Sequence, residues 1–244
     1  MRETKTALFA VLLFCTVEAV AQNAQDVYEA AHAALERGHY ATAMRGWQSL
    51  AAENNAGAKA NLGYMYEHGL GVKMDSDVAM QWYSKAIEGG SAEAAHNLAM
   101  MYRRNYSPEN ARKIVDLLHI AADGGLDESR YMLAVLKYEG SGIDMDKAGA
   151  FVLFKDLAVN GHVGAQYMTA HMVFEGAHAP RNDMAGYVLA LLSSDSSLIE
   201  AEDLVVLGRN RLGVREQERA ENLFSECQER QSARCKLVLS DLLK

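Results

Sequence analysis

The sequence predicts an all-α protein, an α/α solenoid (superhelix) of stacked helical hairpins. First, the 244 residues include 19 glycines but only 2 prolines, so glycine rather than proline marks the ends of helices. Second, a glycine-containing motif recurs about every 36 residues along the chain. Third, each recurrence has room for two amphipathic helices, which bury their apolar faces only by stacking on neighbours.

The composition is that of a globular protein. Half of the residues are apolar and 23% are charged, which excludes a wholly disordered or collagen-like chain. The formal net charge is −8 at pH 7, so there is no basic surplus to neutralise phosphates. Nucleic acid is therefore not an expected partner.

The first 21 residues are predicted to be a secretory signal peptide. Arg2 and Lys5 precede the short apolar run Ala7–Val17, and Ala19–Ala21 offers an A-x-A cleavage site. The run is shorter than the roughly 20 residues that span a bilayer, although a retained anchor helix is the alternative. We expect the mature chain, residues 22–244, to be periplasmic or secreted, with no stable membrane insertion after cleavage.

Two cysteines remain after the predicted cleavage, Cys227 and Cys235. An even pair in an oxidising compartment favours a disulfide. In one continuous helix these residues would lie about 12 Å apart, beyond the roughly 7 Å that a disulfide allows. If the bridge exists, Gln228–Arg234 must form a tight turn between two antiparallel helices; whether it exists stays open at this point.

The internal repeat is clearest between Asn61–Val72 and Met132–Ile143. These copies match at a constant offset of 71 residues at the pairs Leu62/Leu133, Gly69/Gly140, Gly71/Gly142, Val72/Ile143, Asp75/Asp146, Ala79/Ala150 and Gly90/Gly161. Weaker copies lie before, between and after them. About six units with a final helix fill residues 22–244.

Each unit is predicted to contain two helices. In the best copy the first runs over Ala56–His68 and ends at Gly69, which adopts positive φ without steric cost. Asp75 or Asp77 is expected to cap the second, over Val78–Glu88. Its predicted buried stripe is Ala79, Trp82, Tyr83, Ala86 and Ile87.

These residues resemble a known family. The pattern A-x-x-x-L-G-x-x-Y-x-x-G-x-G-V, followed by D, A-x-x-W-Y-x-K-A and G, is similar to the Sel-1-like repeat, a relative of the tetratricopeptide repeat. It is carried here by Ala58, Leu62, Gly63, Tyr66, Gly69, Gly71, Val72, Asp75, Ala79, Trp82, Tyr83, Lys85, Ala86 and Gly90. The resemblance is strong over Ala56–Val163, and Asn105 and Ala179 depart from it in two other units. Secreted cysteine-rich members staple neighbouring helices, which implies that Cys227 and Cys235 pin a capping helix near Ala233–Leu243.

No catalytic, metal or cofactor site is expected. The sequence has no H-E-x-x-H, C-x-x-C, G-x-S-x-G, S-x-x-K or P-loop motif. Its 8 histidines are scattered, and no two of them have the i, i+4 spacing of a helical metal site.

A binding surface is the more informative expectation. The resemblance implies that the first helix of each unit lines a concave face, where an asparagine before the Leu-Gly pair can hold a ligand backbone. The predicted partner-binding residues are Asn61, Tyr64, His68, Asn97, Met100, Arg104, Met132, Met168 and His171. This face is polar in its N-terminal half and methionine-rich beyond, which suits an apolar peptide or helix. Core packing is favoured for Met65, Met101 and Met172. For Met100, Met132 and Met168 it is as good an interpretation as binding, and the asparagines are equally well explained as ordinary exposed residues.

The predicted function is a non-enzymatic scaffold or adaptor of the bacterial cell envelope, or a secreted one, that binds a protein or peptide. The alternative is a cell-wall-active protein or enzyme that binds β-lactams or muropeptides, as proposed for some cysteine-rich relatives. Homo-oligomerisation through the first helix, Gln25–Arg37, is a further possibility for the partner.

Overall fold

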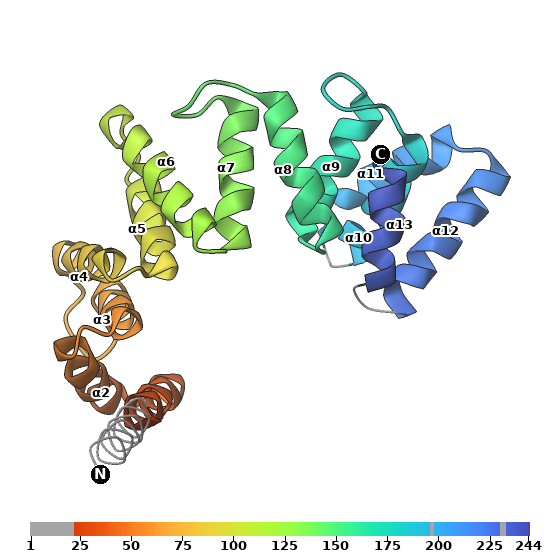
Figure 1. Ribbon diagram of the computed structural model, residues 1–244. Helices are drawn as coiled ribbons and strands as arrows, with labels where there is room; N and C mark the ends of the chain where they lie inside the picture. Colours follow the sequence, from red (N-terminus) through yellow and green to blue (C-terminus); the bar gives the residue numbers. More distant parts are fainter. Residues whose placement is uncertain (1–21, 196–197, 230–232) are drawn as a thin grey trace, which may run out of the picture. The chain divides into compact units, whose positions relative to one another are not determined.

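A computed structural model describes residues 22–195, 198–229 and 233–244, so the predicted signal peptide lies outside the described residues. Every regular element in these ranges is an α-helix, which confirms the all-α prediction. Figure 1 shows the helices joined by short loops. After a first helix over residues 22–36 they are α2 (Tyr40–Ala52), α3 (Ala56–His68), α4 (Ser76–Glu88), α5 (Ala92–Arg104), α6 (Pro108–Asp123), α7 (Asp127–Glu139), α8 (Lys147–Val159), α9 (Val163–Glu175), α10 (Asp183–Asp195), α11 (Ala201–Arg211), α12 (Val214–Glu229) and α13 (Ala233–Leu242).

The chain divides into two compact units, Met1–Met101 and Tyr102–Lys244. The described part of the first unit holds the first helix, α2, α3, α4 and most of α5. The second unit holds the end of α5 and all later helices. Each unit is described separately below.

Side-chain caps start the helices at corresponding places in successive hairpins. Asn55 Oδ1 accepts the Ala58 N–H at 2.8 Å at the start of α3, and Ser91 Oγ accepts the Ala94 N–H at 3.2 Å at the start of α5. Asp75 rather than Asp77 caps α4, by accepting the backbone N–H groups of residues 77 and 78. The remaining side-chain caps of this kind are Asp146 before α8, His162 before α9 and Asn182 before α10.

Glycine in the left-handed conformation ends three of the described helices. Gly69, Gly140 and Gly176 follow α3, α7 and α9 with φ of 66°, 74° and 68°, a conformation that other residues adopt only with strain. The N–H of each glycine bonds a carbonyl group of the preceding helical turn. At the end of α5 Asn105 stands instead of glycine, as the sequence shows.

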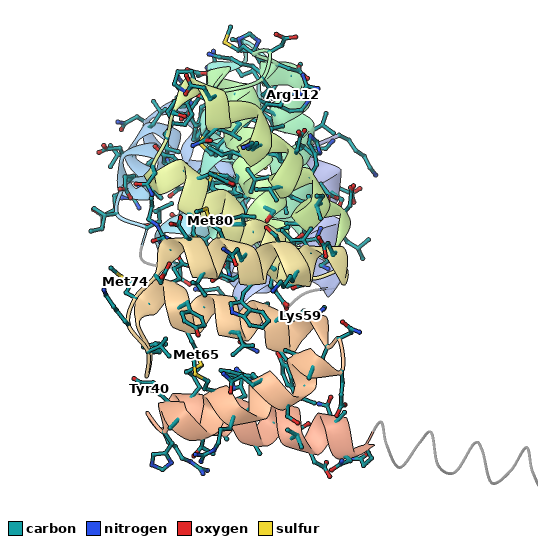
Figure 2. The ribbon with its side chains drawn as sticks, turned by 90° about the vertical axis from the view of Figure 1, so that its left-hand side faces the viewer. Tyr40, Lys59, Met65, Met74, Met80 and Arg112 are labelled. Atoms are coloured by element: carbon teal, nitrogen blue, oxygen red, sulfur yellow. A yellow bond between two sulfur atoms is a disulfide. The ribbon has the colours of Figure 1, made fainter. Side chains whose placement is uncertain are left out.

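The first unit has its core between consecutive helices. Trp47 of α2 and Leu62 and Met65 of α3 are fully buried, and Figure 2 shows Met65 in the layer between α2 and α3. A Cβ atom on Gly63 would lie only 2.7 Å from the ring of Tyr83, so this glycine lets α3 and α4 approach closely.

The predicted buried stripe of α4 is right at three positions and wrong at two. Ala79, Tyr83 and Ala86 are fully buried, whereas Trp82 and Ile87 are half-buried. Trp82 packs at the edge of the first core, and the Nζ of Lys85 lies 4.8 Å from the centre of its ring. The Trp82 indole is large enough to cover the edge of the core while one side stays in solvent.

The last helix folds back onto the core of the second unit. Cys227 and Cys235 form a disulfide with a Cα–Cα distance of 4.6 Å, which joins α12 to α13. Leu239 and Leu243 are buried, and the Nζ of Lys155 donates a 3.2 Å hydrogen bond to the Leu243 carbonyl oxygen. The predicted turn Gln228–Arg234 is shorter than expected, because α12 continues to Glu229 and α13 begins at Ala233; residues 230–232 lie outside the described ranges.

We predict that the disulfide stabilises the second unit. Replacing both cysteines (Cys227→Ser with Cys235→Ser) should lower the free energy of unfolding by about 2–3 kcal/mol, because the closed loop restricts the unfolded chain. Urea unfolding followed by circular dichroism measures this. Dithiothreitol should shift the parent to the same midpoint and leave the variant unchanged; equal midpoints for oxidised parent and variant would contradict the prediction.

A second prediction concerns Asp146, which caps α8 and pairs with Lys137 of α7 at 3.2 Å. The N–H of Gly149, and then Lys137, lower the pKa of the Asp146 carboxyl group. A lowered pKa gives stability that is present above the unfolded-state value, about 3.9, and is lost as pH falls through the folded value.

Asp146→Asn keeps a capping oxygen but removes the charge. It should therefore destabilise the protein at neutral pH, and the difference from the parent should shrink below about pH 4. Urea midpoints across this pH range test the expectation. Asp144→Asn, in the same loop, is the matched control and should follow the parent. A loss that is independent of pH would show that the charge contributes nothing.

Candidate binding surface

The predicted binding residues lie on the first helix of the hairpins, here called helix A; the second is called helix B. Asn61, Asn97, Met132 and Met168 are each the sixth residue of their helices α3, α5, α7 and α9. The repeat therefore brings all four to the same place in successive A helices.

Tyrosine hydroxyls hold the two asparagines of the first unit. Asn61 Nδ2 donates a 2.9 Å hydrogen bond to the hydroxyl oxygen of Tyr28. The side chain of Asn97 hydrogen-bonds the hydroxyl of Tyr83, which itself donates to Glu67 Oε2 at 2.6 Å. Burial raises the pKa of Tyr83, and the bond to Glu67 raises it further, so this hydroxyl stays protonated. Both amides are thus fixed by the fold itself.

Tyr64 and His68 form a second polar group on α3. Their ring centroids lie 4.1 Å apart, and His68 Nδ1 is 3.0 Å from the Tyr64 carbonyl oxygen. Tyr64 is 38% exposed, so its ring is available to a partner. Met100, at the place of Tyr64 on α5, is half-buried.

In the second unit, aromatic side chains dominate the A helices. Tyr131 of α7 stacks on His162 with ring centroids 4.6 Å apart and lies 5.6 Å from the ring of Phe154. A Cβ atom on Gly164 would lie 2.9 Å from Tyr131 Cζ, so the tyrosine packs directly on the first turn of α9. The missing side chain of Gly164 thus makes room for Tyr131.

Tyr131 and Tyr138 of α7 share an electrostatic environment with Tyr167 of α9. Burial raises the pKa of both α7 hydroxyls, and Tyr167 raises both further. Glutamates act in the same direction, Glu128 and Glu139 on Tyr131 and Glu175 on Tyr138. Tyr131, Val135, Tyr138 and Glu139 follow one side of α7 at i, i+4, i+7 and i+8, and Tyr167, His171 and Glu175 follow one side of α9 at i, i+4 and i+8. Tyr131 joins the two helices, because it packs on Gly164 and stacks on His162, which also faces Glu128. We call this surface the α7–α9 stripe; its members are Glu128, Tyr131, Val135, Tyr138, Glu139, Tyr167, His171 and Glu175.

The methionines divide as the sequence indicates. Met65, Met101 and Met172 are buried in the core. Met132 and Met168 are half-buried beside the stripe, and Met168 packs against the core of the second unit. Both side chains are therefore partly packed and partly accessible to solvent.

The last two predicted residues lie in the second unit. Arg104 is exposed in the final turn of α5. His171 belongs to the stripe, half-buried, with Nδ1 3.8 Å from Glu175 Oε2. The structure thus brings His171 together with residues that the predicted set lacks.

Sequence reasoning missed Tyr131, Tyr138 and Tyr167. Tyr131 and Tyr167 are the fifth residues of α7 and α9, directly before Met132 and Met168. The 36-residue spacing could have revealed them, but the best copy of the repeat has Ala60 there, so the family pattern gives that place no weight.

We also searched the described residues for metal sites, membrane-spanning helices and grooves. No group of three or more His, Cys, Asp or Glu side chains among them could hold a metal ion. None of the described helices is long and apolar enough to cross a membrane. A polar groove of about 620 Å³ lies between α6 and the loop before α8, and none of the predicted binding residues lines it; Arg112, labelled in Figure 2, lies at this groove.

The chain is built of consecutive helical hairpins. Their caps, glycines and outward-facing A-helix residues recur at a fixed register, and this arrangement defines an α-solenoid repeat protein. The Sel1 repeat family model matches residues 56–91, 92–126, 127–155 and 163–196, more than half of the chain. The chain belongs to the Sel1 repeat family, as the sequence pattern predicts. Sel1 repeat proteins are typically non-catalytic scaffolds that mediate protein–protein interaction.

Relatives match over parts of their length. The ERAD-associated E3 ubiquitin-protein ligase component HRD3 of Candida glabrata is 44% identical over 50 residues, 20% of this chain and 6% of that protein. The alginate biosynthesis protein AlgK of Azotobacter vinelandii is 37% identical over 99 residues, 40% of this chain and 21% of AlgK. The chain thus spans about a fifth or less of the length of these relatives.

A solved structure shows the same fold. The protein c5321, a protective antigen of uropathogenic Escherichia coli strains that displays an SLR fold, superposes with a TM-score of 0.74 at 22% identity. The superposition covers 92% of this chain and 49% of c5321. It confirms the α-solenoid fold class.

Proposed function

We propose that this protein is a non-enzymatic scaffold or adaptor that binds a partner protein or peptide along its A helices. The observation that carries the proposal is the row of partly exposed side chains at one register of successive A helices, held in place by the core. Tyrosine and methionine are enriched where proteins bind one another, and a side chain fixed beforehand loses little entropy on binding.

The two units offer different chemistry to a partner. In the first, Asn61 and Asn97 present amide groups that tyrosine hydroxyls orient. An oriented amide can bond the backbone of an extended peptide. In the second, the α7–α9 stripe and its flanking methionines offer apolar and aromatic surface. Each unit therefore offers its own kind of contact to a partner.

We propose that the protein acts in the bacterial cell envelope or is secreted. The basic and apolar N-terminal sequence with its A-x-A site supports export. The Cys227–Cys235 disulfide favours an oxidising compartment. The similarity to an alginate biosynthesis protein and to a component of a ubiquitin ligase supports a role within a larger assembly.

The experiment compares two double variants in affinity capture from an envelope extract, followed by binding assays with each purified partner. Asn61→Ala with Asn97→Ala removes the amides and should weaken partner binding about tenfold or more, because two hydrogen bonds are lost. Tyr28→Phe with Tyr83→Phe removes the same internal hydrogen bonds but keeps the amides. It should weaken binding less than the asparagine variant does, because only the fixed orientation of the amides is lost.

Three outcomes are decisive. A much larger loss of binding in the asparagine variant than in the tyrosine variant supports the proposed face. Equal binding by the parent and the asparagine variant places the partner elsewhere. The absence of any specific partner, or turnover of muropeptides or penicillins by the purified protein, would overturn the scaffold proposal.

A further inference from the structure

The α7–α9 stripe carries three glutamates around its tyrosines. Glu128 lies in the first turn of α7, Glu139 ends α7 and Glu175 ends α9. The side chains of Glu128 and Glu175 are 75% and 47% exposed. Negative charge therefore borders the half-buried aromatic surface from both helices.

No lysine or arginine of the described residues forms an ion pair with these glutamates. Glu128 Oε1 lies 3.4 Å from His162 Nε2, Glu175 faces His171, and Glu139 Oε2 accepts a 3.3 Å hydrogen bond from the Ser141 hydroxyl. A histidine is a cation only when protonated, so these neighbours are weaker counter-charges than a lysine or an arginine would be.

The nearby aspartates are paired with cations. Arg130 pairs with both Asp127 and Asp156, and Lys137 pairs with Asp146. In α10, Asp183 pairs with Arg181 and Arg211 through the contacts at 3.0 and 3.2 Å. The cations of α7, the α9–α10 loop and α11 are thus engaged with aspartates. Lys147 lies at the stripe, over the Tyr138 ring, but it forms no ion pair with the three glutamates among the described contacts.

The α9 tyrosine of the stripe, Tyr167, packs partly against the core of the second unit and leaves the rest of its side chain accessible. Tyr131 is stacked on His162, and Lys147 Nζ lies 4.6 Å from the centre of the Tyr138 ring. Tyr167 is half-buried and makes no aromatic or cation contact of this kind within the described part of the chain. A tyrosine face attracts a cation, as the Lys147–Tyr138 contact in the same unit shows.

We infer that the α7–α9 stripe binds a cationic segment of a partner protein, with an arginine or lysine side chain over Tyr167 and among the three glutamates. The apolar neighbours of that cation in the partner would contact Val135 and Met168. The inference rests on the proposed function. It specifies the chemistry of the partner segment that binds the second unit. Charge complementarity selects this occupant over a purely apolar or an acidic segment.

The test uses three synthetic peptides of one design and the full mature chain with ¹³C-methyl methionine. Each acetylated and amidated 12-residue peptide alternates leucine with arginine, with citrulline or with glutamate. Citrulline keeps the shape of arginine without its charge. NMR titration reads the methyl signals of Met132 and Met168 beside the stripe, and the signal of Met74, which is 65% exposed and belongs to the first unit, reports non-specific binding.

The arginine peptide should shift the Met132 and Met168 signals and bind about tenfold more tightly than the citrulline peptide. The glutamate peptide should bind more weakly still. Removing the three charges (Glu128→Gln, Glu139→Gln and Glu175→Gln) should weaken the arginine peptide about tenfold, and added salt should weaken it in the parent.

A matched variant loses the same charge from exposed positions on helices B. Its three substitutions are Asp116→Asn, Asp123→Asn and Glu218→Gln, and it should bind the arginine peptide like the parent. If it loses as much affinity as the stripe variant, only net charge matters and the inference is overturned. Tyr167→Ala should also weaken the arginine peptide.

The failures of the two proposals are distinguishable. Equal affinity for the arginine and citrulline peptides, with shifts at Met132 and Met168, keeps a peptide-binding face but overturns the cationic preference. No shift at these methyl groups with any peptide also overturns the inference. Neither result alters the capture experiment on Asn61 and Asn97, which tests the scaffold function by itself.

Discussion

The structure depends on close contacts between small residues and aromatic rings in neighbouring helices. Gly63 of α3 has no room for a side chain, because the ring of Tyr83 occupies that space. In the second unit, a Cβ atom on Gly208 would lie 2.6 Å from the Tyr187 ring. Such contacts bring helices together at the separation that dense packing requires. Each also fixes a tyrosine hydroxyl, which donates to Glu67 in the first unit and to Glu221 in the second.

This packing reaches the binding surface through shared side chains. The hydroxyl of Tyr83, set by Gly63, also contacts Asn97, so the core of one hairpin orients an amide of the next. In the second unit, Gly164 lets Tyr131 lie on α9, which links two successive A helices. The residues that we propose for partner binding are therefore held by the same contacts that hold the hairpins together, and side chains fixed in this way favour binding.

The sequence predicts local structure well and spatial neighbours less well. The range Ala56–His68 is the observed α3, because the capping and terminating signals of Asn55 and Gly69 are local. Trp82 was wrongly placed in the core, since helical periodicity does not tell the edge of a core from its centre. The tyrosine group of the stripe was missed for a similar reason. Tyr131 and Tyr167 become neighbours only when α7 and α9 pack, and neither place carries weight in the repeat pattern.

One repeat architecture therefore presents two different sets of side chains on its A helices. The caps, the glycines and the small core residues are needed for every hairpin and leave little freedom. The fifth, sixth and ninth residues of helix A are outside these constraints, so α3 and α5 carry asparagines where α7 and α9 carry methionines. The matches to HRD3 and AlgK cover small parts of those proteins. This is expected of a repeat architecture, because stacked units can be reused in proteins of different length. In the proposed function, specificity depends on which side chains occupy these few places and the last place of helix A. Charge varies at that last place, where α7 and α9 carry glutamate, α3 histidine and α5 arginine.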